Sequence, residues 1–137
     1  MKLTPEYFAC LLYRQHTGKT VLATSAQSSP TDFDAKLPAL DAVATLSEDK
    51  RTLYIAVVNR SEDHPVDTKI RVKGWTPGAS SPARVFEING KDKNAANPFG
   101  SSENVNIQEK SWTFTGTEGS YRFPAHSVTV LELKGTI

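Results

Sequence analysis

The chain has 137 residues, and its 16 lysines and arginines against 15 aspartates and glutamates give a formal net charge of +1. This length suits one domain, and the balanced charge offers no electrostatic footprint for nucleic acid or an anionic membrane. The single cysteine, Cys10, excludes an intrachain disulfide and suits a reducing compartment. No apolar run is long enough for a transmembrane helix or a signal peptide, so we expect a soluble, cytoplasmic protein.

The first predicted element is a helix that begins at Thr4 and runs to about His16. Thr4 can cap the helix and Pro5 fits its first position, and we expect Gly18 to close it in the left-handed conformation. The stretch Tyr7–Tyr13 is apolar without interruption, which spreads apolar surface around the helix instead of along one stripe. We therefore expect the helix to pack against a second body outside this chain or against another copy of the chain. The residues that would make this contact are Tyr7, Phe8, Leu11 and Leu12.

The stretch Leu40–Asn59 is typical of one β-hairpin. In Leu40–Leu46 apolar residues occupy every second position, and Leu53–Val58 is apolar on both faces. A strand that is apolar on both faces is expected to lie centrally in a sheet. The charged segment Ser47–Arg51 predicts a longer hairpin connection, because it contains no Asn-Gly or Asp-Gly step.

Short strands separated by turn signals make up the rest of the chain. They are predicted at residues 21–24, 66–73, 83–88, 105–108, 111–115, 121–123 and 127–133. Residues 91–104 form a polar stretch that predicts a loop, and residues 116–119 predict a turn. This spacing predicts an all-β fold, an antiparallel, jelly-roll-like β-sandwich preceded by one N-terminal α-helix.

The histidines give no sign of a metal or catalytic centre. They are His16, His64 and His126. They lie far apart and lack metal-ligand spacing, so we predict no metal site. We also predict no cofactor. The sequence Asn59–Ser61 matches a glycosylation acceptor, which has meaning only in a secreted protein.

The acidic residues of the region before the hairpin, Asp32, Asp34 and Asp41, are spaced so that two of them could meet. A pair of carboxylates is the requirement for glycoside hydrolysis. The favoured interpretation is that they are turn residues and part of a solvated strand face.

Three aromatic residues are candidates for stacking against sugar rings. They are Trp75, Trp112 and Tyr121. Flat aromatic faces suit carbohydrates as they suit other apolar planes, and Trp75, in a loop rich in glycine and proline, is expected to be the most exposed. Packing in the core or anchoring of a loop is the favoured alternative, because large aromatic residues are usually well buried.

Three stretches in the same order resemble the C-terminal region of α-L-arabinofuranosidases of glycoside hydrolase family 51. TPEYFACLLYRQHTG is similar to the last helix of the family's (β/α)8 barrel, PALDAVATLSEDKRTLYIAVVNRS to the central hairpin of its C-terminal sandwich, and FPAHSVTVLEL to the closing strand. The resemblance thus implies two parts, a barrel-type helix in residues 1–18 and a sandwich domain in residues 19–137. It also implies that strands from the N-terminal part of the family's chain join the sandwich, so that this chain leaves a sheet edge unpaired or covers it by self-association.

The family's barrel carries out retaining hydrolysis with two glutamates, and the resemblance brings neither of them to this chain. A barrel takes about 250 residues, and the sequence contains no Asn-Glu step of the kind that holds the family's acid/base glutamate. We therefore expect a non-catalytic domain that supports an absent barrel, without enzymatic activity of its own. The alternative is a carbohydrate-binding module for arabinose-containing glycans.

Overall fold

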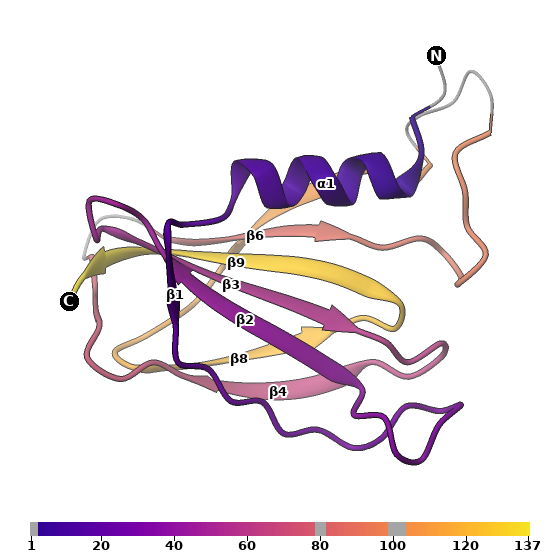
Figure 1. The fold of residues 1–137 in the computed structure, drawn as a ribbon, viewed down its shortest axis with the longest axis horizontal. Helices are drawn as coiled ribbons and strands as arrows, with labels where there is room; N and C mark the ends of the chain where they lie inside the picture. Colours follow the sequence, from indigo (N-terminus) through magenta and orange to yellow (C-terminus); the bar gives the residue numbers. More distant parts are fainter. Residues whose placement is uncertain (1–2, 79–81, 99–103) are drawn as a thin grey trace.

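The computed structural model describes residues 3–78, 82–98 and 104–137. Within these ranges the chain forms one large antiparallel sheet, a small two-stranded sheet and one helix, α1 (Figure 1). The large sheet has the strand order β1-β2-β3-β9-β6-β7, with β5 paired to the end of β9, and β4 pairs with β8 in the small sheet. The predicted all-β sandwich with one N-terminal helix is confirmed.

The elements have the following bounds. They are α1 (Pro5–Gln15), β1 (Thr20–Leu22), β2 (Leu40–Leu46), β3 (Thr52–Asn59), β4 (Val66–Arg71), β5 (Thr76–Pro77), β6 (Ala83–Ile88), β7 (Ile107–Trp112), β8 (Glu118–Phe123) and β9 (Ser127–Thr136).

The N-terminal helix starts where the sequence predicts. The Thr4 side chain accepts a hydrogen bond from the backbone N–H of Tyr7, with Pro5 in the first turn. The prediction that Gly18 adopts the left-handed conformation is wrong, because its φ is not in that region. Glycine is needed there for space, since a Cβ atom would lie 2.3 Å from the backbone carbonyl of Leu46.

Strand β3 lies between β2 and β9, which confirms the central position predicted for it. Because successive side chains of a strand point to opposite faces, β3 contributes to two separate cores. Leu53, Ile55 and Val57 belong to an inner core between the two sheets, and Tyr54 and Ala56 border an outer core. Helix α1 covers this outer core, whereas β4 and β8 lie on the other side of the large sheet (Figure 1).

The predicted segments differ from the observed strands mainly after β6. Two short strands were expected at 105–108 and 111–115, but residues 107–112 form the single strand β7, paired with β6 residue by residue. Strand β8 begins at Glu118, inside the predicted turn. The sequence does not predict one continuous strand here, because β7 is a polar edge strand and its alternation between apolar and polar residues is weak. Of the predicted loop 91–104, residues 99–103 lie outside the described ranges.

Candidate functional site

Helix α1 is buried on one side and open on the other. Leu12 is completely buried, and Phe8, Ala9 and Tyr13 pack partly buried against the outer core. On the side away from the sandwich, positions 7, 10, 11 and 14 share one helical face. This outer helix face consists of Tyr7, Cys10, Leu11 and Arg14. Tyr7 is 46% exposed, Cys10 is exposed and Leu11 is only half-buried, so apolar surface of the helix remains accessible.

Both ends of the helix are attached to the rest of the chain. At the C-terminal end the His16 ring stacks on Phe86 with centroids 3.8 Å apart, and its Nδ1 lies 3.3 Å from Oε2 of the buried Glu132. At the N-terminal end the Asn97 side chain donates a hydrogen bond to the Leu3 carbonyl at 3.0 Å. The sandwich therefore fixes the direction in which the outer helix face points.

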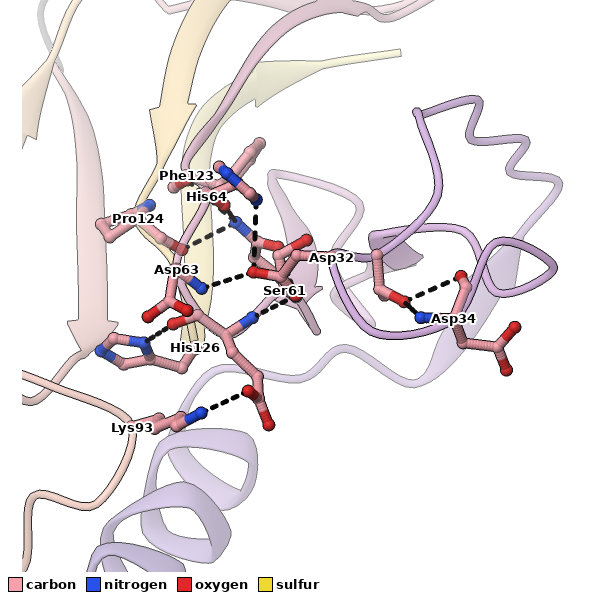
Figure 2. Close-up of polar contacts among 12 residues, drawn as sticks. Asp32, Asp34, Ser61, Asp63, His64, Lys93, Phe123, Pro124 and His126 are labelled. Carbon is pink, nitrogen blue, oxygen red and sulfur yellow. Dashed lines mark hydrogen bonds and ion pairs between the residues drawn. The ribbon is translucent and has the colours of Figure 1, made fainter.

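A polar cluster lies at the end of β3, where the β3–β4 loop meets the loop before β2 (Figure 2). The carboxylate of Asp32 accepts hydrogen bonds from the backbone N–H groups of Glu62, at 2.8 Å, and Asp63, at 2.7 Å. His64 Nδ1 lies 3.2 Å from the same carboxylate. The hydrogen bond from the Glu62 N–H, followed by that from Asp63, holds the pKa of Asp32 below its ordinary value. Asp32 therefore acts as an ionised anchor between two loops.

The other acidic residues considered for a carboxylate pair have separate roles. Asp34 accepts from the backbone N–H of Lys36 within its own turn and points away from Asp32 (Figure 2), and Asp41 lies 3.8 Å from Arg60 Nη1. These contacts agree with the favoured interpretation of turn and strand-face residues. Among the described residues, no cluster of three or more histidines, cysteines, aspartates or glutamates could hold a metal ion.

The sequence that matched a glycosylation acceptor has a structural role. Asn59 is 1% exposed, and its amide nitrogen lies within hydrogen-bonding distance of the carbonyls of His64, Phe123 and Pro124, at 3.0, 3.2 and 2.9 Å. Its side-chain oxygen accepts from the Ser61 N–H at 3.0 Å. The side chain joins the end of β3 to the chain beyond β8, and its burial leaves no access for a glycan.

The three candidate aromatic residues do not form one platform. Trp75 is 5% exposed and belongs to the inner core, so the prediction that it is the most exposed of the three is wrong. It is buried because its ring packs over Gly135, where a Cβ atom would lie 2.9 Å from the indole. Trp112 and Tyr121 are half-buried and meet edge to face, with ring centroids 6.0 Å apart. Both of their polar atoms are engaged, Trp112 Nε1 with the Ser120 carbonyl and the Tyr121 hydroxyl with Glu87.

Glu87 is a buried acid that the sequence analysis missed. It accepts hydrogen bonds from the hydroxyls of Tyr121, at 2.7 Å, and Thr129, at 3.0 Å, and Lys110 Nζ lies 3.3 Å away. Burial, together with the hydrogen bond to Glu87, raises the pKa of Tyr121. A signal was present in the sequence, because Glu87 shares the inward face of β6 with Val85 two residues earlier.

A pocket of about 250 Å³ lies between the first turn of α1, the end of β6 and the start of β9. Apolar side chains such as Ala9, Ile88 and Val128 line one part of it, and His126 and Lys93 line another. Across the described part of the chain, no helix is both long and apolar enough to cross a membrane.

The fold defines a class of small all-β domain. It is an antiparallel sandwich of two unequal sheets, and a helix covers the outer face of the larger sheet. The particular family follows from comparison with known proteins. The family model for the α-L-arabinofuranosidase C-terminal domain matches residues 1–127, and the chain belongs to this family. The resemblance noted in the sequence is thus confirmed.

Individual relatives agree with this family. The "Probable alpha-L-arabinofuranosidase C" of Aspergillus clavatus is 39% identical over 97 residues, which is 71% of this chain, and the alpha-L-arabinofuranosidase C of Emericella nidulans is 33% identical over 97 residues. Among solved structures, the α-L-arabinofuranosidase from Thermotoga maritima, in its arabinose complex, is similar with a TM-score of 0.84 and 30% identity. The GH51 enzyme from Thermotoga petrophila is similar with a TM-score of 0.86 and 30% identity.

The share of each relative that is matched is small. The chain spans 17% of the two fungal proteins and 29% of the two Thermotoga chains, although 97% of this chain is covered in the structural comparisons. What the chain resembles is therefore one domain of much longer proteins.

Proposed function

We propose that this chain is a non-catalytic supporting domain that packs against the catalytic (β/α)8 barrel of an α-L-arabinofuranosidase through the outer helix face. The observation that carries the proposal is the state of α1. The sandwich holds both ends of the helix, yet Tyr7 and Cys10 remain exposed on the opposite side. Apolar positions that continue around a helix require cover on more than one side, and a neighbouring barrel would supply that cover.

In this proposal the hydrolysis of arabinofuranosides belongs to the barrel, whose two glutamates would act as acid/base and nucleophile. The chain described here contributes no catalytic residue and requires no cofactor. Its sandwich would fix the position of α1, the segment that resembles the barrel's last helix, and residues 19–137 would form a separate supporting domain. We further propose that the protein works in the cytoplasm, which its single cysteine suits.

The small sheet supports a second contact with the rest of such an enzyme. Within the described residues β4 and β8 pair only with each other, so each has a free edge. The inward side chains Val66 and Ile70 of β4 are only half-buried against the inner core. A further strand beside β4 would cover them and pair its edge, as the family resemblance implies for strands from the N-terminal part.

The proposal is tested by complementation. A GH51 relative, such as the Thermotoga petrophila enzyme, is expressed without its own C-terminal domain and mixed with this chain. The release of arabinose from a chromogenic arabinofuranoside is then measured. We expect this chain to restore activity, and the substitutions Tyr7→Asp and Leu11→Asp to prevent it. Lys50→Asp, at an exposed position in the turn between β2 and β3, is the matched surface control and should restore activity as the unchanged chain does.

The relative's own C-terminal domain serves as the positive control. If that domain restores activity and this chain neither binds nor restores it, the proposed role is wrong. Arabinose release by this chain alone would also contradict it. If the unchanged chain instead forms dimers that Tyr7→Asp dissociates, the outer helix face serves self-association.

A carbohydrate-binding module is the alternative function. Trp112 and Tyr121 are favoured for this role because they are neighbours and partly exposed. Titration with arabinan or arabinoxylan oligosaccharides would give saturable binding that Trp112→Ala abolishes. Trp75→Ala is unsuitable for this test, because it would empty part of the inner core.

A further inference from the structure

His126 occupies a strained backbone position in the turn that leads from β8 into β9. Its φ is +45°, in the left-handed region that non-glycine residues seldom adopt. The backbone N–H of His126 donates to the Ser61 carbonyl at 2.8 Å, which ties this turn to the β3–β4 loop. Strain of this kind persists only where surrounding contacts hold it, and the contacts of the His126 side chain are among those that can do so.

The imidazole ring lies between two backbone carbonyl groups. Nδ1 is 2.7 Å from the carbonyl oxygen of Glu62, and Nε2 is 3.2 Å from that of Gly90 (Figure 2 shows the first contact). A carbonyl oxygen can only accept a hydrogen bond, and a neutral imidazole carries one N–H group. Both contacts can be hydrogen bonds only when both ring nitrogens are protonated. A neutral ring can donate to only one of the two carbonyls.

A charged pair joins the same two loops beside the ring. Lys93, in the loop after β6, forms an ion pair with the Glu62 carboxylate (Figure 2). The charged groups on the elements that surround His126 are Glu6 on α1, Glu62, Asp63 and His64 in the β3–β4 loop, and Lys91, Asp92 and Lys93 after β6. Among these, the four acids outnumber the two lysines, and one lysine is already paired with an acid.

We propose that His126 is a proton-dependent clamp, which in its doubly protonated form joins the Glu62 carbonyl to the Gly90 carbonyl and releases one of the two loops when it is neutral. The loop after β6 borders the pocket beside the first turn of α1, and Gly90 and His126 are part of its lining. The protonation of one ring therefore controls how firmly the loop after β6 is held to the β3–β4 loop. This inference rests on the ring geometry alone and holds whether or not α1 contacts a barrel.

The first test uses the unaltered chain. Long-range ¹H–¹⁵N NMR correlations report the protonation of each histidine ring between pH 5.5 and 8.5, and ¹⁵N–¹H spectra follow the backbone amides. We expect the amide signals of Asp63 and Lys91, whose peptide bonds contain the two carbonyls, to shift with the same midpoint as the His126 ring. If they shift with His64 instead, or do not shift while His126 titrates, the clamp is refuted.

The second test uses the substitution His126→Asn, since asparagine tolerates the left-handed backbone but cannot bridge two carbonyls as a cation does. The unfolding equilibrium constant is measured in urea for both chains at each pH. Because a hydrogen bond from a charged donor is roughly twice as strong as a neutral one, we expect the substitution to raise that constant about tenfold more at pH 5.5 than at pH 8.5. The control is His64→Asn, at a ring that is 72% exposed and should show a much smaller dependence on pH. An effect of His126→Asn that does not change with pH would overturn the proposal, and if the variant fails to fold, the NMR test on the unaltered chain decides.

Discussion

Replacement of the buried Asn59 by alanine is expected to be among the most destabilising single changes in this domain. The alanine would leave the Ser61 N–H without its acceptor and would remove the amide donor from the carbonyls of Phe123 and His64. The Pro124 carbonyl would keep a hydrogen bond from the Ser127 hydroxyl at 2.7 Å. A buried polar group left unsatisfied costs about 1–3 kcal/mol. His64 is exposed and its carbonyl can recruit water, whereas Ser61 and Phe123 are fully buried. Counting mainly these two groups, we expect a loss of about 3–5 kcal/mol, a large part of the 5–15 kcal/mol that stabilises a typical domain.

The loss is measured by equilibrium unfolding in urea, followed by tryptophan fluorescence. The urea concentration at the unfolding midpoint should fall. The slope of the unfolding free energy against urea concentration should stay the same, because the surface exposed on unfolding is nearly unchanged. Asn94→Ala, at an exposed position in the loop after β6, is the matched control and should change the free energy of unfolding by less than about 0.5 kcal/mol. If Asn59→Ala lowers stability by less than about 1 kcal/mol, the view of Asn59 as a buried tie between strands is wrong.

Three further changes test other parts of the fold. Backbone hydrogen bonds lower the pKa of Asp32 in the folded chain, so its ionised form stabilises the fold above an unfolded pKa of about 3.9. This stabilisation is lost as the pH falls through the lowered folded pKa. Asp32→Asn should therefore make the stability depend less steeply on pH below pH 4, as measured by circular dichroism. Gly18→Ala, whose Cβ would lie 2.3 Å from backbone atoms, should lower the melting temperature far more than Gly78→Ala, whose Cβ would lie 3.5 Å from its nearest neighbour. Tyr121→Phe removes one donor to the buried Glu87 and should cost about 1–3 kcal/mol in urea unfolding; no change would mean that water replaces the hydroxyl.

Local patterns in the sequence were sufficient to predict the helix and the central hairpin. The cap at Thr4 and the alternation of apolar residues along Leu40–Asn59 depend on neighbours in the chain, and the structure has both elements where they were expected. The burial of Trp75 could not be predicted in the same way. It depends on Gly135, which lies far away in the sequence and leaves room for the indole ring. A flanking glycine and proline indicated a loop correctly but gave no information on what the loop packs against.

The clamp at His126 also depends on contacts between residues far apart in the chain, which local sequence patterns do not predict. The residues whose carbonyls contact its ring are 64 and 36 positions away in the chain. The sequence contains three separated histidines and no spacing that relates one of them to a function. Only the pairing of β3 with β9 and of β9 with β6 brings the two loops to opposite sides of the ring. A site made of backbone carbonyls leaves no trace in residue identity, because any residue can supply them.

Helix α1 links the fold to the proposed role, because the sandwich buries one of its sides and leaves apolar residues exposed on the other. Towards the sandwich, Leu12 is completely buried and the His16 ring stacks on Phe86, so these positions are explained by this chain alone. Away from it, Tyr7 and Leu11 have no comparable cover, although they cost free energy when exposed to water. The sandwich thus accounts for one side of an unusually apolar helix, and the proposed contact with a barrel would account for the other. A barrel packed against the open side of this helix would meet that requirement through the same residues that the complementation experiment alters.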